Sequence, residues 1–166
     1  MATVTHPLDP GSAQSLSSAF PALVRGGINF PASGLAFDAA INEAAFWLIR
    51  AANYGTGNVT IHVDWYADTA TIGDIVWQAQ LAAITPDVDT QDVETKPLAT
   101  LNTFTDTHLG TVGQRLHRAV ITMTNLDALA ANDDLWVRIA RDASNAADTM
   151  AGDAILTLAA VSYSDV

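Results

Sequence analysis

Residues 58 to 65 read NVTIHVDW, and this stretch alternates between polar and apolar side chains without exception. Its apolar positions are Val59, Ile61, Val63 and Trp65. An apolar residue at every second position indicates a β-strand that buries one face and leaves the other to solvent. The stretch therefore predicts an antiparallel sheet with one covered face.

Other parts of the chain show the same strand pattern. Residues 134–141 place Leu135 and Val137 on one face and Trp136 on the other. Further strands are expected at 35–37, 45–49, 74–84, 98–106, 116–124 and 154–163. The last of these is apolar on both faces, which predicts a central position in a sheet.

The connections between these strands decide the fold class. About eight short strands, uneven connections and no strand–helix–strand rhythm favour an all-β, jelly-roll-like antiparallel β-sandwich. Only Glu43 and Glu94 among the 18 acidic residues are Glu, and Asp suits turns better than helix interiors. The one short helix expected is NLDALAAND, residues 125–133, with an Asn or Asp cap.

Composition limits the classes of partner. The 166 residues fit one domain, and the net charge of −11 argues against nucleic-acid binding and against an anionic membrane surface. No apolar run approaches the roughly 20 residues of a membrane span. Only 15% of residues are charged, below the roughly 25% of typical soluble domains, which indicates that partners bury part of the surface.

Residues 1–33 differ from residues 34–166. They carry four of the six prolines, which interrupt helices and sheet ladders. We therefore expect an extended N-terminal arm before a jelly-roll domain. The arm is either a flexible tail or a segment that docks on a neighbouring subunit. The apolar side chains available for such contacts are Leu16, Phe20, Leu23, Val24, Ile28 and Phe30.

No pattern of residues in the sequence indicates catalysis. A Gly-rich phosphate loop, a nucleophile elbow and a zinc-protease motif are all missing, so we expect no enzyme activity, cofactor or metal. His62 and Asp64 share one strand face, and such a pair can hold a metal or a proton. Asp87, Asp89 and Asp92 form an oxygen-rich loop of the kind that suits calcium. For both groups a solvated polar surface is the simpler interpretation.

Two features near the C-terminus have a more specific interpretation. The loop that follows residue 140 carries Arg141, Asp142 and Asp148, and an Arg beside two Asp predicts an ion pair that orders the loop. Trp136 lies opposite the apolar face of its strand, together with Arg138. Because exposed aromatic side chains bind ligands and partners, Trp136 is our candidate platform, with packing under a second layer as the alternative.

Several stretches together resemble small structural proteins of tailed bacteriophages. They are residues 46–48, 58–67, 73–77, 134–142, 147–149 and 152–154, followed by a last strand that ends at residue 163. The resemblance covers roughly residues 35–166, and the Arg-Asp loop is among its least generic parts. Similar proteins form single jelly-roll domains on virions, where they serve as capsid decoration (cement) proteins.

The resemblance implies a role in the virion. It implies that the protein lies on the capsid exterior and binds the major capsid protein of the assembled shell. It also implies that the protein is a homotrimer that stabilises the shell through non-covalent contacts. Related modules occur in head fibres and tail appendages, which implies an alternative: binding of a host surface glycan. The sequence leaves both possibilities open.

Overall fold

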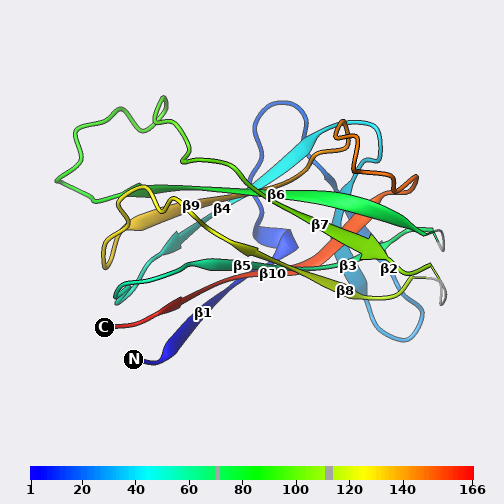
Figure 1. Cartoon of the computed structure of the whole chain (residues 1–166), viewed down its shortest axis with the longest axis horizontal. Helices are drawn as coiled ribbons and strands as arrows, with labels where there is room; N and C mark the ends of the chain where they lie inside the picture. Colours follow the sequence, from blue (N-terminus) through cyan, green and yellow to red (C-terminus); the bar gives the residue numbers. More distant parts are fainter. Residues whose placement is uncertain (70–71, 111–113) are drawn as a thin grey trace.

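The computed structural model describes residues 1–69, 72–110 and 114–166, which form two antiparallel sheets packed face to face (Figure 1). The larger sheet contains β1 (Thr3–Leu8), β2 (Ala22–Gly26), β3 (Ala32–Phe37), β5 (Thr60–Ala67), β8 (His117–Thr122) and β10 (Ala154–Ser164). The smaller sheet contains β4 (Glu43–Arg50), β6 (Gly73–Ile84), β7 (Asn102–His108) and β9 (Asp134–Arg141). A short 3-10 helix, η1 (Pro10–Ser12), follows β1. The expected β-sandwich is confirmed.

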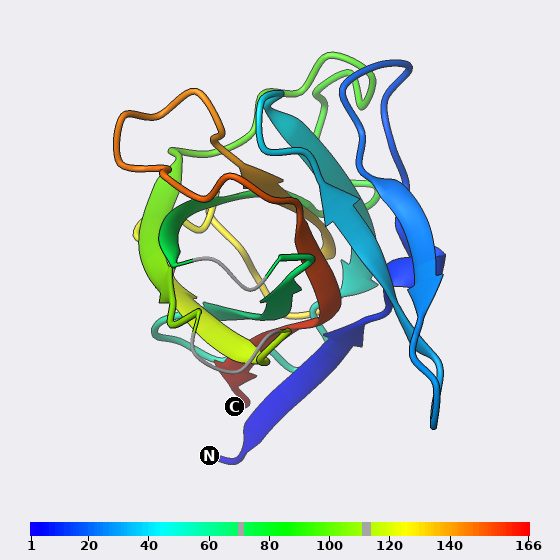
Figure 2. The same cartoon turned by 90° about the vertical axis from the view of Figure 1, so that its right-hand side faces the viewer.

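The order of the strands has the character of a jelly roll. The six-stranded sheet runs β2-β3-β10-β5-β8, with β1 also paired to β10, and the four-stranded sheet runs β4-β9-β6-β7. Between β3 and β10 the chain crosses from one sheet to the other at every connection except β6–β7. The sheets curve around a common interior (Figure 2). As expected, β10 is a central strand.

Aromatic side chains fill the space between the sheets. Trp65 of β5 and Trp77 of β6 are fully buried and meet edge to face, with ring centroids 6.1 Å apart. Phe37 of β3 packs against Trp77 in the same manner at 5.2 Å. Edge-to-face contacts add to the stabilisation from area burial. The alternation read from the sequence therefore orients the core residues of both sheets correctly.

Residues 1–33 are extended, as expected, but they contribute two strands to the six-stranded sheet. β1 pairs with β10 from Thr3 opposite Ser164 onward, and β2 pairs with β3. Pro7 is tolerated within β1 because this strand pairs on one side only. The boundary drawn after residue 33 falls inside β3, so this segment is continuous with the sandwich and not a separate arm.

The prediction of a short helix at residues 125–133 is wrong. Asp127, Ala128 and Asn132 have φ angles of 56°, 56° and 70°, which place them in the left-handed region and exclude a right-handed helix. The segment forms successive turns, and Asp133 holds them by accepting hydrogen bonds from Thr85 and from the Ala130 backbone. Within the described residues, no helix is long and apolar enough to cross a membrane.

Arg141, at the end of β9, is fully buried and uses all five of its N–H donors. Its Nε and Nη2 donate to the two carboxylate oxygens of Asp148 at 3.0 and 2.7 Å. Nη1 donates to the backbone oxygens of Phe37 and Gly152, and Nη2 also donates to that of Met150. One side chain thus ties β9 to β3 and to the loop that leads into β10.

Asp148 and Asp142, the two acidic residues expected beside Arg141, have different roles. Asp148 is as buried as its partner and also accepts a hydrogen bond from the Val76 amide at 3.1 Å. Asp142 lies outside the ion pair and instead accepts from Gln78 at 2.8 Å and Asn42 at 3.1 Å. Arg141 and Asp148 therefore form the ordering pair, and Asp142 joins the loop to β6.

Removal of the Asp148 carboxylate should destabilise the fold strongly. We expect Asp148→Ala to lower the free energy of unfolding by about 3–5 kcal/mol, because it leaves Arg141 charged and buried without a counter-ion. Urea unfolding measures this difference. The matched control is Asp134→Ala, whose pair with Arg50 is solvent-exposed and should contribute about 0–1 kcal/mol. Equal losses in the two variants would contradict this role of the pair.

Candidate functional site: a groove on the outer face of the four-stranded sheet

The outer face of the four-stranded sheet carries a patch of large side chains. Pairing of β4, β9 and β6 aligns Leu48, Trp136 and Ala82 in one row across the sheet. The adjacent row contains Phe46, beside Arg138 of β9. All of them point away from the core, because the neighbouring positions of each strand fill it. Trp136 and Phe46 are therefore half-buried on a surface that faces outward.

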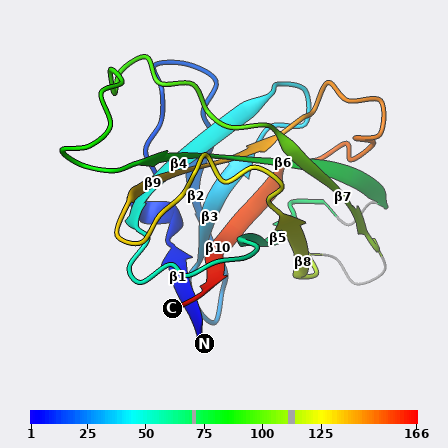
Figure 3. The ribbon, with the colours of Figure 1, turned by 60° about the vertical axis from the view of Figure 1, so that its left-hand side comes forward.

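Two distant segments rise on either side of this patch and turn it into a groove. Residues 14–16 lie against β4, where the Gln14 and Phe46 backbones exchange hydrogen bonds of 2.8 and 2.9 Å. Residues 93–98 lie on the opposite side, in the long loop after β6 (Figure 3). The groove has a volume of about 340 Å³, and Trp136, Phe46 and Ala82 line its floor.

Hydrogen bonds hold the floor and one wall of the groove in place. Lys96 forms an ion pair with Asp127 at 2.9 Å, although its side chain is only 8% exposed. Beside Trp136, Arg138 donates to Gln80 at 3.0 Å, and Gln80 donates to the Ala99 carbonyl at 2.9 Å. Burial lowers the pKa of Arg138, and the charge of Asp142 partly offsets this effect. A floor fixed in this way is preorganised for binding.

The lining of the groove suits binding better than chemistry. It is mainly apolar and aromatic, with Gln14, Ser15 and Lys96 as its polar members. Among the described residues that line it there is no carboxylate and no histidine, the usual general acids and bases. Apolar clefts of this size with a few polar groups are typical of ligand-binding sites.

The structure brings together only some of the residues predicted to contact partners. Leu16 and Trp136 both line the groove. Phe20 and Leu23 line a neighbouring crevice beside β2, which shares Gln14 and Ser15 with the groove. The remaining three lie on the β2–β3 hairpin: Val24, Ile28 and Phe30. The seven predicted contacts are therefore spread over three places and do not form one site.

Sequence reasoning identified only Leu16 and Trp136 among the residues that line the groove, and Phe46, Lys96 and Leu98 are among those it missed. Phe46 had a usable signal, because it alternates with the buried Trp47 and so must face outward. Lys96 and Leu98 had none, because they come from a long loop whose position depends on contacts with distant strands. Strand parity identifies a groove floor, whereas groove walls depend on tertiary structure.

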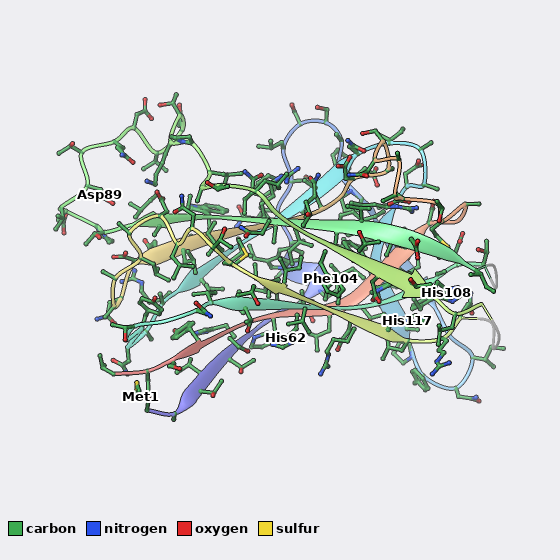
Figure 4. All side chains as sticks on the ribbon, viewed as in Figure 1. Met1, His62, Asp89, Phe104, His108 and His117 are labelled. Atoms are coloured by element: carbon green, nitrogen blue, oxygen red, sulfur yellow. The ribbon has the colours of Figure 1, made fainter. Side chains whose placement is uncertain are left out.

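His62 and Asp64 lie on the outer face of the other sheet and do not act as a pair. Asp64 is engaged by Arg118, which donates to both of its carboxylate oxygens at 2.5 and 2.7 Å. Its partner is thus a guanidinium and not an imidazole. His62, labelled in Figure 4, lies on β5, and its Nε2 is 3.4 Å from the Thr60 hydroxyl.

The acidic loop after β6 also uses its carboxylates internally. Asp89 accepts a hydrogen bond from the Thr85 amide and Asp92 accepts one from the Glu94 amide, both at 2.9 Å. Both carboxylates therefore cap turns of the loop. Over the described residues, no group of three or more His, Asp or Glu side chains is placed to hold a metal ion.

His108 and His117 form a ring pair where β7 and β8 lie beside each other (Figure 4). Their ring centroids are 5.0 Å apart, and Trp65 packs on His117 at 5.1 Å. Burial lowers the pKa of His117; the charge of Asp106 opposes this shift and His108 adds to it. This apolar setting favours the neutral imidazole and links the stability of the β7–β8 seam to pH.

Comparison with solved structures gives distant similarity. No family model matches the chain, and no curated protein matches its sequence. A solved structure described as CBM28, a carbohydrate-binding module specific for non-crystalline cellulose, is 13% identical, with a TM-score of 0.48. The match covers 90% of this chain and 84% of that one. This similarity is too distant to indicate a ligand.

The lowered pKa of His117 predicts the direction of a pH effect on stability. The unfolded chain takes up the proton near pH 6.5, whereas the folded chain takes it up only at lower pH. The contribution of neutral His117 to the free energy of unfolding is therefore fully present above about pH 6.5. It is lost as the pH falls towards the pKa of His117 in the folded chain. We expect the urea midpoint to fall between about pH 7.5 and 5.5, and to fall less in His117→Gln. An identical pH dependence in both proteins would contradict this.

Proposed function

We propose that the protein is a non-catalytic module of a phage head fibre or tail appendage, and that it binds a host surface glycan in the Trp136 groove. The observation that carries the proposal is the half-buried Trp136 on the floor of an outward-facing groove, next to Phe46. An aromatic ring offers an apolar surface to the C–H face of a sugar. The phage context rests on the sequence resemblance alone.

The polar residues of the groove support a glycan over a purely apolar ligand. Gln14 and Ser15 lie on one wall, whereas Lys96 on the other wall is already engaged by Asp127. The Gln14 and Ser15 side chains can hydrogen-bond the hydroxyls at the edge of a sugar ring while the aromatic floor contacts its face. Because no acid–base pair is present in this lining, the bound glycan would be retained and not cleaved.

Trp136→Ala should abolish glycan retention without unfolding the protein. The expected loss of affinity is at least tenfold, about 1.4 kcal/mol, because the apolar platform is removed. Affinity electrophoresis through gels that contain candidate host polysaccharides measures it, with circular dichroism as the check on folding.

The matched control for this experiment is Phe104→Ala. Phe104 is an exposed aromatic residue on β7, outside the groove, and its removal should leave glycan retention unchanged. Equal retention by wild type and Trp136→Ala would contradict the proposed site. Absence of retention on every polysaccharide would contradict the glycan as ligand.

A second candidate function has a different observation in its favour. The resemblance implies a capsid decoration protein on the capsid exterior, bound without covalent bonds to the major capsid protein. The β2–β3 hairpin carries two large, exposed apolar side chains at its tip, Ile28 and Phe30. Exposed apolar side chains that cluster in this way are typical of protein interaction sites. A protein that binds only the assembled shell stabilises it by mass action.

Replacement of both tip residues by Ser should weaken binding to the shell. We expect Ile28→Ser with Phe30→Ser to reduce co-sedimentation with capsids that lack the protein by at least tenfold, because both apolar contacts are lost. Deletion of residues 1–33 is not a usable test, because it removes β1 and β2 from the sheet. Val88→Ser, at an equally exposed loop position, is the control, and undiminished binding of the tip variant would exclude this role for the hairpin.

A further inference from the structure

One part of the surface carries almost no charge. The chain has 18 acidic residues and a net charge of −11, yet Arg25 is the only charged residue between positions 10 and 37. The same segment exposes large apolar side chains, among them Leu23 at 51%, Ile28 at 102% and Phe30 at 73%. Such a combination of missing charge and exposed apolar surface is unusual for a face that remains in water.

The segment also contains an open sheet edge. β2 pairs with β3 on one side, and no strand among the described residues pairs with its other side. By contrast, the edge of β4 is covered, because residues 14 and 19 form backbone hydrogen bonds with it. Edge strands are usually protected by charges, prolines or bulges, and β2 (ALVRG) has a single Arg. Its unpaired backbone groups are therefore available to another strand.

We propose that β2 is the contact between two copies of this chain, which pair edge to edge and antiparallel about a twofold axis near Val24. In this register Leu23 of one copy lies opposite Arg25 of the other, and no carboxylate faces another. The two six-stranded sheets become one continuous sheet across the dimer. This inference concerns assembly and does not depend on the glycan proposal, whereas it competes with the capsid proposal for Ile28 at the hairpin tip.

The apolar side chains beside β2 have the spacing that this register requires. Phe20 precedes Val24 by four residues and Ile28 follows it by four. The register therefore brings Phe20 of one copy towards Ile28 of the other. Phe20 and Leu23 line a crevice of about 250 Å³ that is open beside the strand. The hairpin tip projects away from the two sheets (Figure 2) and can reach the crevice of the second copy. Because of the twofold axis, this contact occurs twice in the dimer.

Charge does not oppose a second copy at this edge. Two chains that each carry −11 repel where their acidic loops meet, whereas the segment from 10 to 37 contains no carboxylate at all. A twofold contact is self-complementary, so each copy supplies the same open edge and the same apolar side chains. The result is a closed dimer, which departs from the trimer that the sequence resemblance implies.

The test is the native mass of the full chain, measured by light scattering after gel filtration. We expect wild type at twice 17.5 kDa, and Val24→Asp at half of the wild-type mass because it places the carboxylates of both copies directly opposite each other at the axis. Ile28→Asp, at a fully exposed tip that cannot affect folding, should weaken dimerisation at least tenfold. Val88→Asp is the matched control on the loop after β6 and should remain dimeric.

Hydrogen exchange provides an independent measurement at the same strand. In the dimer, amides within residues 22–26 should exchange slowly, and Ile28→Asp should accelerate their exchange. A wild-type monomer, a trimer, or a dimer that persists in both Asp variants would overturn the proposal. Protection of residues 22–26 that arises only when capsid protein is added would also overturn it, and would assign the edge to the capsid.

Discussion

The fold depends most on the buried guanidinium of Arg141. An unpaired charge in this position would destabilise the core, so the chain must bring Asp148 and three backbone carbonyls to it. These partners come from β3 and from the loop before β10. In meeting the hydrogen-bonding needs of one side chain, the chain also fixes the end of β9, the strand that carries Trp136 and Arg138. The groove is thus built on a strand anchored at its far end.

The sequence predicts the strands that bury one face and fails where structure depends on distant partners. The alternation in residues 58–65 and 134–141 identifies β5 and β9, because solvent and core select opposite sides of each strand. β1 was missed because Pro7 argues against a strand unless an open edge is known. The prediction of a helix at 125–133 was wrong because local composition does not reveal which residues adopt the left-handed conformation of turns.

The candidate site shows the same division. Trp136 could be assigned to the outer face from parity alone, and the structure places it there beside Phe46. The walls of the groove come from residues 14–16 and 93–98, which are far apart in the sequence and joined only by the fold. The crevice beside β2 shares Gln14 and Ser15 with one wall of this groove, so the proposed dimer contact and the proposed ligand site are neighbouring surfaces of one sandwich.

The central claim is that the ligand binds in the Trp136 groove. It is tested most directly by a ¹H–¹⁵N NMR titration of the full chain with the glycan it retains. Trp47, Trp65 and Trp77 are buried, so the account predicts that the indole N–H signal of Trp136 shifts most, together with amides of residues 14–16 and 93–98. Shifts confined to the outer face of the six-stranded sheet, around His62 and Arg118, would contradict it.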